Sequence, residues 1–139
     1  MSNNTQNWRI DIDTDNLAWL HFDKADASTN VLSKDVLAEL SEKVTELENS
    51  KANCVIIVSD KDNGFIAGAD IEGFTVLKNA DEGVALIQEA QQLFDRIESL
   101  PMPTLCVING FCLGGGLELA LSCRYRLALD DPKTKLGFP

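Results

Sequence analysis

The first apolar residues of the chain alternate with polar ones and predict two short strands. Residues 8–13 place tryptophan and isoleucine at every second position, and residues 17–22 are again strand-like. The intervening Thr14-Asp15-Asn16 is made of residues that favour turns. The pattern therefore predicts a β-hairpin.

Two later segments repeat apolar residues at three- and four-residue intervals, which is the period of an amphipathic helix. The first covers residues 34–49, and Ser33 can cap its start. The second covers residues 82–100 and is stopped by Pro101-Met102-Pro103. Each helix is expected to pack through one stripe: Val36, Leu37, Leu40, Val44 and Leu47 in the first, and Val84, Leu86, Ile87, Leu93, Phe94, Ile97 and Leu100 in the second.

Two uninterrupted apolar runs, residues 54–58 and 104–108, have the pattern of strands covered on both faces. Residues 117–122 predict a short apolar helix, and residues 125–129 predict a further strand. No internal repeat or interdomain linker is visible. Because strands alternate with helices, the sequence predicts an α/β fold in one domain, or in part of one.

Composition and charge limit the kinds of molecule that the protein is expected to bind. The 139 residues are 45% hydrophobic and 24% charged, which is ordinary for a globular protein. A net charge of -10 disfavours nucleic acid and anionic lipid. No apolar run approaches the ~20 residues of a membrane span, and the start lacks the regions of a signal peptide. We therefore expect a cytoplasmic protein with no membrane or nucleic-acid partner.

The cysteines and the histidine give no metal-binding pattern. Four cysteines lie in apolar stretches without a C-x-x-C pair, and His21 is the only histidine. The sequence therefore predicts no metal site and no disulfide framework, and we expect the thiols to be buried and reduced.

The three consecutive glycines Gly114 to Gly116, between a buried strand and a helix, need a physical reason because glycine loses the most backbone freedom on folding. One reason is a close approach of the backbone to another group. Another is that the free N–H groups of the helix's first turn face a partly negative atom. The spacing fits neither a phosphate loop nor a dinucleotide loop. A carbonyl oxygen that gains charge in a transition state suits these donors better.

Glu118 lies in the first turn of the same helix and admits two interpretations. An acid there complements the helix dipole, which is worth roughly 0.3–1 kcal/mol, and spacing alone favours this interpretation. The apolar residues that follow, 119–121, favour instead a partly buried carboxyl group suited to general acid–base catalysis.

A second glycine-bearing loop, residues 60–70, also leaves a buried strand and leads to a predicted short helix at residues 70–72. Its backbone N–H groups make an oxyanion hole conceivable. The commoner outcome for such a segment is a surface loop in which Asp70 caps the helix.

Together these loops resemble the signature segments of the crotonase, or enoyl-CoA hydratase/isomerase, superfamily. The first segment is residues 65–71, FIAGADI, and the second is residues 108–120, INGFCLGGGLELA. They stand in the family's order and at its usual separation, and the resemblance covers nearly the whole chain. The chain is most similar to the start of the α-chain of bacterial fatty-acid oxidation complexes.

This resemblance implies the crotonase (ClpP-like) ββα-spiral fold, of which the chain would be the N-terminal portion. It implies that the backbone N–H groups of Ala69 and Gly115 form an oxyanion hole for a thioester carbonyl. Glu118 would be one of two catalytic carboxylates. The residues implied to lie along bound coenzyme A are Ala67, Gly68, Asp70 and Ile71.

The resemblance also implies parts beyond the sequence. In the family, a second glutamate directly follows a stretch like residues 136–139, and C-terminal helices cover the acyl pocket and help to assemble trimers. We therefore expect residues 1–139 to be a partial domain that, in the intact protein, is a homo-oligomer or part of a fatty-acid oxidation complex. The acyl-CoA is the expected substrate. No cofactor is expected, because NAD would serve only the dehydrogenase part of such complexes, which the sequence lacks.

Three functions follow from these expectations. The first is hydration of 2-enoyl-CoA to 3-hydroxyacyl-CoA in fatty-acid β-oxidation, with this chain alone essentially inactive. The second is Δ3-Δ2 enoyl-CoA isomerisation, which needs mainly one carboxylate; in simple isomerases of the family that is often the later one, so Glu118 favours the hydratase. The third is a non-catalytic fragment that binds coenzyme A or associates through exposed apolar surface.

Overall fold

The alternating segments at the start of the chain form the predicted hairpin. In the computed structural model, which describes residues 6–69 and 80–139, β1 (Trp8–Ile12) pairs in antiparallel register with β2 (Leu17–Phe22). The ring of Trp8 stacks on that of Phe22, with centroids 4.1 Å apart and 9° between the planes. Asn16 closes the turn with φ of 60°, which asparagine tolerates better than most residues.

The hairpin is one edge of a five-stranded sheet in the order β1-β2-β3-β5-β7. The strands β3 (Cys54–Ser59), β5 (Thr104–Ile108) and β7 (Tyr125–Ala128) run parallel to β2. Consecutive residues 55–57 of β3 are all buried, which confirms a strand covered on both faces. At the opposite edge, all four residues of β7 are exposed.

Three further strands lie in segments whose composition predicts loops or no regular structure. They are β4 (Gly64–Ile66), β6 (Phe111–Leu113) and β8 (Lys135–Gly137), and they form a separate parallel sheet in the order β4-β6-β8. Three residues are too few to show a period of two, and each strand is held by a partner distant in the chain. The prediction that residues 60–70 form a loop was therefore wrong at β4, and β6 lies in a segment for which no strand was predicted.

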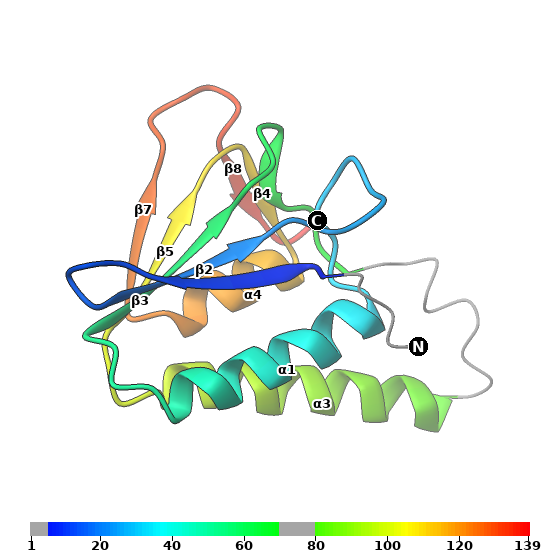
Figure 1. The fold of residues 1–139 in the computed structure, drawn as a ribbon. Coiled ribbons are helices and arrows are strands. Elements are labelled where there is room, and N and C mark those ends of the chain that lie inside the picture. Colours follow the sequence, from blue (N-terminus) through cyan, green and yellow to red (C-terminus); the bar gives the residue numbers. More distant parts are fainter. Residues whose placement is uncertain (1–5, 70–79) are drawn as a thin grey trace.

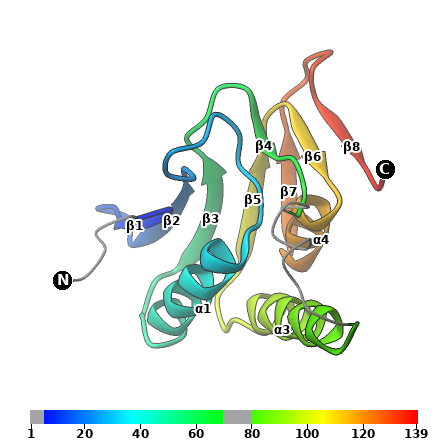
Figure 2. The same cartoon turned by 90° about the vertical axis from the view of Figure 1, so that its right-hand side faces the viewer.

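The helices α1 (Lys34–Glu48) and α3 (Ala80–Glu98) lie on one side of the large sheet, as Figure 1 and Figure 2 show. The predicted stripe of α1 is confirmed, with four residues buried and Leu37 partly buried, and the Ser33 hydroxyl accepts a hydrogen bond from the Val36 N–H at 3.3 Å. The short α4 (Gly115–Ser122) contacts α3 and the small sheet. Among the described residues, no helix is both long and apolar enough to cross a membrane.

The predicted stripe of α3 holds only in its second half. Leu93, Phe94 and Ile97 are buried, whereas Val84 and Ile87 are each 52% exposed. The amino-terminal end of α3 extends beyond α1, as Figure 1 shows, so these earlier positions have less of the fold to pack against. The period predicts the helix correctly but not how much of its stripe is covered.

The cysteines lie in the interior as free thiols. Cys106, Cys112 and Cys123 are buried and Cys54 is half-buried, which confirms most of the prediction. Burial raises the pKa of the Cys112 thiol to about 11. A hydrogen bond with Cys123, together with burial, raises the pKa of Cys106 above its ordinary value. These thiols therefore stay protonated at neutral pH.

Candidate active site

Two glycine-bearing loops meet at the edge of the small sheet. Residues 67–69 follow β4, and Gly114 follows β6; these two strands are parallel neighbours. The carboxyl ends of parallel neighbours lie at the same edge of a sheet, so both loops leave from one edge. The pairing of β4 with β6 therefore joins the two segments that the sequence singles out.

Glycine is required where these segments cross. A Cβ atom on Gly116 would lie 2.6 Å from the Cβ of Ile66 and 2.8 Å from its carbonyl oxygen. A Cβ atom on Gly110 would lie 2.8 Å from the carbonyl oxygen of Asn63. All three distances are shorter than ordinary contacts, so no side chain fits at either position. Close approach of the backbone, one of the two reasons inferred for the glycines, is confirmed.

Two other glycines turn the loops toward each other at the donor positions. Gly68 and Gly114 have φ of 122° and 53°, in the region that favours glycine. A Cβ atom on Gly114 would lie 3.8 Å from the Cα of Gly68, so the two turns are in contact. The next residue after each turn is one of the predicted donors, Ala69 and Gly115. The structure thus brings the two predicted donors into the same region.

The backbone around the two donors is held on both sides. The Leu32 N–H donates to the Gly68 carbonyl at 2.8 Å, and the Gly114 N–H donates to the Gly137 carbonyl at 2.9 Å. The N–H groups of Ala69 and Gly115 donate to no other residue that the structure describes. Two N–H donors that have no acceptor among the described residues, each directly after a turn held by hydrogen bonds, are the arrangement that an oxyanion hole needs.

The four residues predicted along coenzyme A divide into two groups. Ala67 is half-buried and its N–H donates to the Asn30 carbonyl at 2.9 Å, and Gly68 is buried. Asp70 and Ile71, with the short helix predicted there, lie outside the described residues. Contact between this loop and coenzyme A stays a prediction.

Glu118 lies in the first turn of α4, and its N–H donates to the Gly114 carbonyl at 3.0 Å. Its side chain is exposed, so the expected partly buried setting is wrong for this structure. The apolar neighbours Leu117, Leu119 and Ala120 turn inward, and the outward face carries Glu118 with the 54% exposed Leu121. Consecutive residues of a helix are about 100° apart, so apolar neighbours in sequence do not imply burial.

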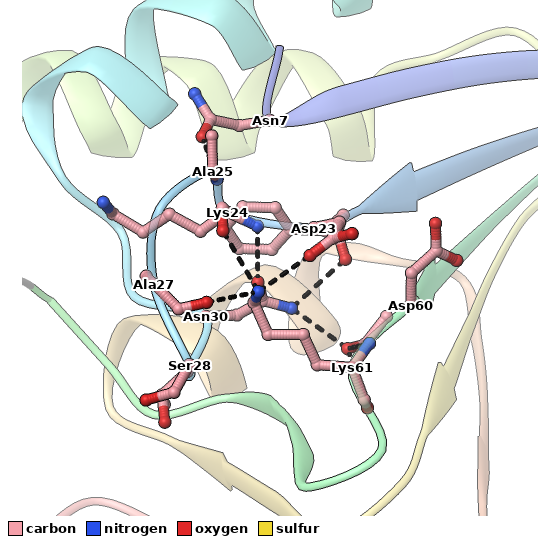
Figure 3. Close-up of polar contacts among 12 residues, drawn as sticks. Asn7, Asp23, Lys24, Ala25, Ala27, Ser28, Asn30, Asp60 and Lys61 are labelled. Atoms are coloured by element: carbon pink, nitrogen blue, oxygen red, sulfur yellow. Dashed lines mark hydrogen bonds and ion pairs between the residues drawn. The ribbon is translucent and has the colours of Figure 1, made fainter. Parts of the chain in front are cut away.

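Asn30 binds residues 65 and 67, which lead into the Gly68 turn, and nothing in the sequence marks it as important. It is fully buried, and its Nδ2 lies within 3.2 Å of the Phe22 carbonyl, the Ser59 hydroxyl and the Phe65 carbonyl. Its Oδ1 accepts from the Lys24 N–H at 2.8 Å. Figure 3 shows Asn30 at the centre of these contacts. A polar residue in a polar segment is expected to be exposed, so the burial of Asn30 is seen only in the folded structure.

The geometry agrees with what comparison with known proteins finds. The family model for enoyl-CoA hydratase/isomerase matches residues 14–139. The chain belongs to this family. A curated member, the fatty acid oxidation complex subunit alpha of Aliivibrio fischeri, is 44% identical over 129 residues, which are 91% of this chain and 19% of the relative.

Solved members of the enoyl-CoA hydratase/isomerase family share the fold. The crystal structure of an enoyl-CoA hydratase from Bacillus anthracis has a TM-score of 0.86 and 28% identity, over 96% of this chain and 50% of the relative. An enoyl-CoA hydratase/carnithine racemase from Magnetospirillum magneticum has a TM-score of 0.83 and 28% identity, over 96% of this chain and 51% of the relative. The crotonase fold is thereby confirmed, and the chain spans about half the length of these relatives.

Proposed function

We propose that this chain is the thioester-binding part of an enoyl-CoA hydratase, and that the complete enzyme adds water to 2-enoyl-CoA to give 3-hydroxyacyl-CoA. The observation that carries the proposal is the meeting of two glycine turns, Gly68 and Gly114, each followed by an N–H group that donates to no residue in the described ranges 6–69 and 80–139. The family membership and the likeness to a fatty acid oxidation complex subunit support it.

The chemistry explains why donors of this kind are needed. Water attacks C3 of the enoyl thioester while a proton is delivered to C2, and negative charge builds on the thioester oxygen as an enolate forms. In the proposal, the Ala69 and Gly115 N–H groups hold that oxygen, which costs no reorganisation because both turns are already fixed. Acyl-CoA is the substrate, and the reaction uses no further cofactor.

Glu118 is proposed as one of two carboxyl groups that activate water and deliver the proton. Its exposure in this chain leaves room for a substrate or for further residues of a longer protein to cover it. Losing one general acid–base group typically costs ~10²–10⁴-fold in rate. Because the family resemblance puts the second glutamate beyond residue 139, we expect the chain alone to be slower than an intact hydratase by about that factor.

The proposal is tested by measuring the hydration of crotonyl-CoA in the intact protein that contains this chain. The reaction is monitored as the decrease in ultraviolet absorbance that accompanies loss of the conjugated double bond. Glu118→Gln should lower kcat by ~10²–10⁴-fold with little change in KM. Glu42→Gln, at an exposed glutamate of α1, is the matched control and should leave both constants unchanged. Equal activity of the Glu118 and Glu42 variants would refute the assigned role. Product analysis with a 3-enoyl-CoA separates hydration from isomerisation.

One observation favours the non-catalytic alternative, association through exposed apolar surface. Tyr125 and Leu127 on β7, and Leu129 and Phe138 beyond it, are each 58–62% exposed. An edge strand with exposed apolar side chains favours pairing with another chain. We expect oligomers of the 139-residue chain in sedimentation velocity, and a monodisperse monomer would contradict this alternative without bearing on hydration.

A further inference from the structure

The ammonium group of Lys61, three residues before β4, is almost enclosed by the protein. Its side chain is 12% exposed. The Nζ atom donates to the Asp23 carboxylate at 2.7 Å, the Ala27 carbonyl at 2.7 Å and the Lys24 carbonyl at 3.0 Å, as Figure 3 shows. The three N–H groups of the ammonium therefore each have an oxygen acceptor, and all three acceptors belong to residues 23–27.

This turn contains a conformation that needs support. Asp26, between two of the carbonyl groups bound by Lys61, has φ of 57°. Few residues other than glycine adopt this region, and aspartate does so more readily than most. The Lys24 and Ala27 carbonyls converge on Nζ because the chain reverses at Asp26. The ammonium group thus binds a turn that local preference alone holds weakly.

Lys61 also contacts the segment that leads into β4 and the segment that leads into β6. The Lys61 N–H donates to the Ser59 hydroxyl at 3.0 Å, and that hydroxyl donates to the Gly64 carbonyl at 2.7 Å, at the start of β4. The Lys61 carbonyl accepts from the Asn109 side chain at 3.1 Å, directly before Gly110. Lys61 therefore joins the 23–27 turn to the amino ends of β4 and β6, the two strands that lead into the residues carrying the proposed donors.

The turn that Lys61 holds continues into the support of the Ala69 donor. Three residues after Ala27, the Asn30 carbonyl accepts from the Ala67 N–H at 2.9 Å. The Leu32 N–H then donates to the Gly68 carbonyl at 2.8 Å, one residue before Ala69. Residues 30–32 therefore hold the backbone directly before Ala69, and they begin three residues after Ala27, the last residue that the Lys61 ammonium group binds.

A simpler interpretation is that Lys61 only forms a surface ion pair. The Asp23 carboxylate is 59% exposed, and such a pair contributes little because water and salt screen it. The two carbonyl contacts are different, because they satisfy a cation that is largely removed from water. Removing the carboxylate alone and removing the ammonium alone should therefore have unequal effects.

We propose that Lys61 is a positioning residue for the thioester site. It holds the 23–32 segment so that the Ala69 N–H and the Gly115 N–H can donate to the same thioester oxygen. This inference rests on the proposed oxyanion hole and adds a residue to it that touches neither substrate nor donor. Its effect passes through the backbone of residues 23–32, so its loss loosens one donor loop and leaves the large sheet intact.

The test uses Lys61→Met in the 139-residue chain, which keeps the apolar stem and removes the ammonium group. Lys43→Met, at a lysine of α1 that is 19% exposed and paired with Glu46, is the matched control. Amide hydrogen exchange is measured at Leu32 and Ala67, with Ile57 of β3 as the internal reference. Lys61→Met should exchange at Leu32 and Ala67 about tenfold faster or more, with Ile57 unchanged. Asp23→Asn should show a smaller rise than Lys61→Met, and Lys43→Met should show none.

A second measurement reports the polarisation of a bound thioester carbonyl. The probe is p-dimethylaminocinnamoyl-CoA, whose absorption moves to the red when its carbonyl oxygen accepts hydrogen bonds. Lys61→Met should bind the probe but lose at least half of the red shift that the wild-type chain produces. A role confined to stability would leave the shift of the folded, bound fraction unchanged.

Each result distinguishes this inference from the proposed function. Unchanged exchange at Leu32 and Ala67, an equal rise at Ile57, or an unchanged red shift would each overturn the role of Lys61 while leaving the oxyanion hole in place. If the wild-type chain binds the probe without any red shift, the proposed thioester site fails. In that case the exchange measurement still decides whether Lys61 holds the loop.

Discussion

Replacing Gly116 with alanine tests the contact between α4 and β4 on which the site depends. The new methyl group would lie 2.6 Å from the Cβ, 2.8 Å from the carbonyl oxygen and 2.9 Å from the Cγ2 of Ile66. Ile66 is fully buried, and one of the three atoms belongs to its backbone. The clash therefore cannot be relieved by turning a side chain, and α4 must move away from β4.

The magnitude follows from two opposing terms. Overpacking a closed interior site costs about 1–3 kcal/mol, and the backbone contact here places the cost in the upper part of that range. Alanine regains up to about 1 kcal/mol through its helix preference. The net expectation is a loss of about 1–2 kcal/mol in the free energy of unfolding. For a chain of this size that is a fall in Tm of about 3–8 °C.

The neighbouring Gly115→Ala is the matched control. Its methyl group would meet only the Cδ1 end of Leu32, at 3.1 Å, and a flexible side chain can yield there. We expect its stability to stay within about 0.5 kcal/mol of wild type. Urea unfolding followed by circular dichroism compares the three proteins. Equal midpoints for the Gly116 and Gly115 variants would refute the close approach of α4 to Ile66.

Three further predictions concern the surrounding fold. Asn30→Ala should lower the free energy of unfolding by about 2–4 kcal/mol, because it leaves buried oxygen atoms without donors. The control Asn63→Ala, at an exposed side chain, should change the stability measured in urea by less than about 0.5 kcal/mol. Equal losses in the two variants would contradict the burial of Asn30. Arg96 donates to Glu48 at 2.8 Å and lowers the pKa of Glu48 from 4.5, so the folded state binds that proton less readily and stability is lost as pH falls below about 4.5. Arg96→Met should make stability fall less steeply between pH about 5 and 3, and an unchanged slope would refute the pairing. Burial and raised thiol pKa values should make Cys106 and Cys112 react slowly with a disulfide reagent at pH about 8 in the native chain and at once in guanidinium chloride. Fast reaction of both thiols in the native chain would contradict their burial.

Hydrophobic periodicity by itself determined the larger elements. A period of two over residues 8–22 produced the hairpin, and three- and four-residue intervals produced α1 and α3. An uninterrupted apolar run identified β3 as a strand covered on both faces. These features are local, because the side-chain directions of a strand or helix repeat along the chain and need no distant partner. The sequence also predicted a role for the glycine clusters, because the conformational entropy that glycine loses on folding implied a close approach of the backbone to another group.

Only the tertiary structure decided which segments meet. The strands β4, β6 and β8 are three residues each and exist through pairing with one another. The outward face of Glu118 depends on where α4 lies, and the sequence pattern around it suggested burial. Asn30 and Lys61 gain their roles from acceptors that include residues about 30 or more positions away. Local sequence encodes the direction of a side chain, whereas the identity of its distant neighbours is set by how the layers pack, and the candidate site is made of such neighbours.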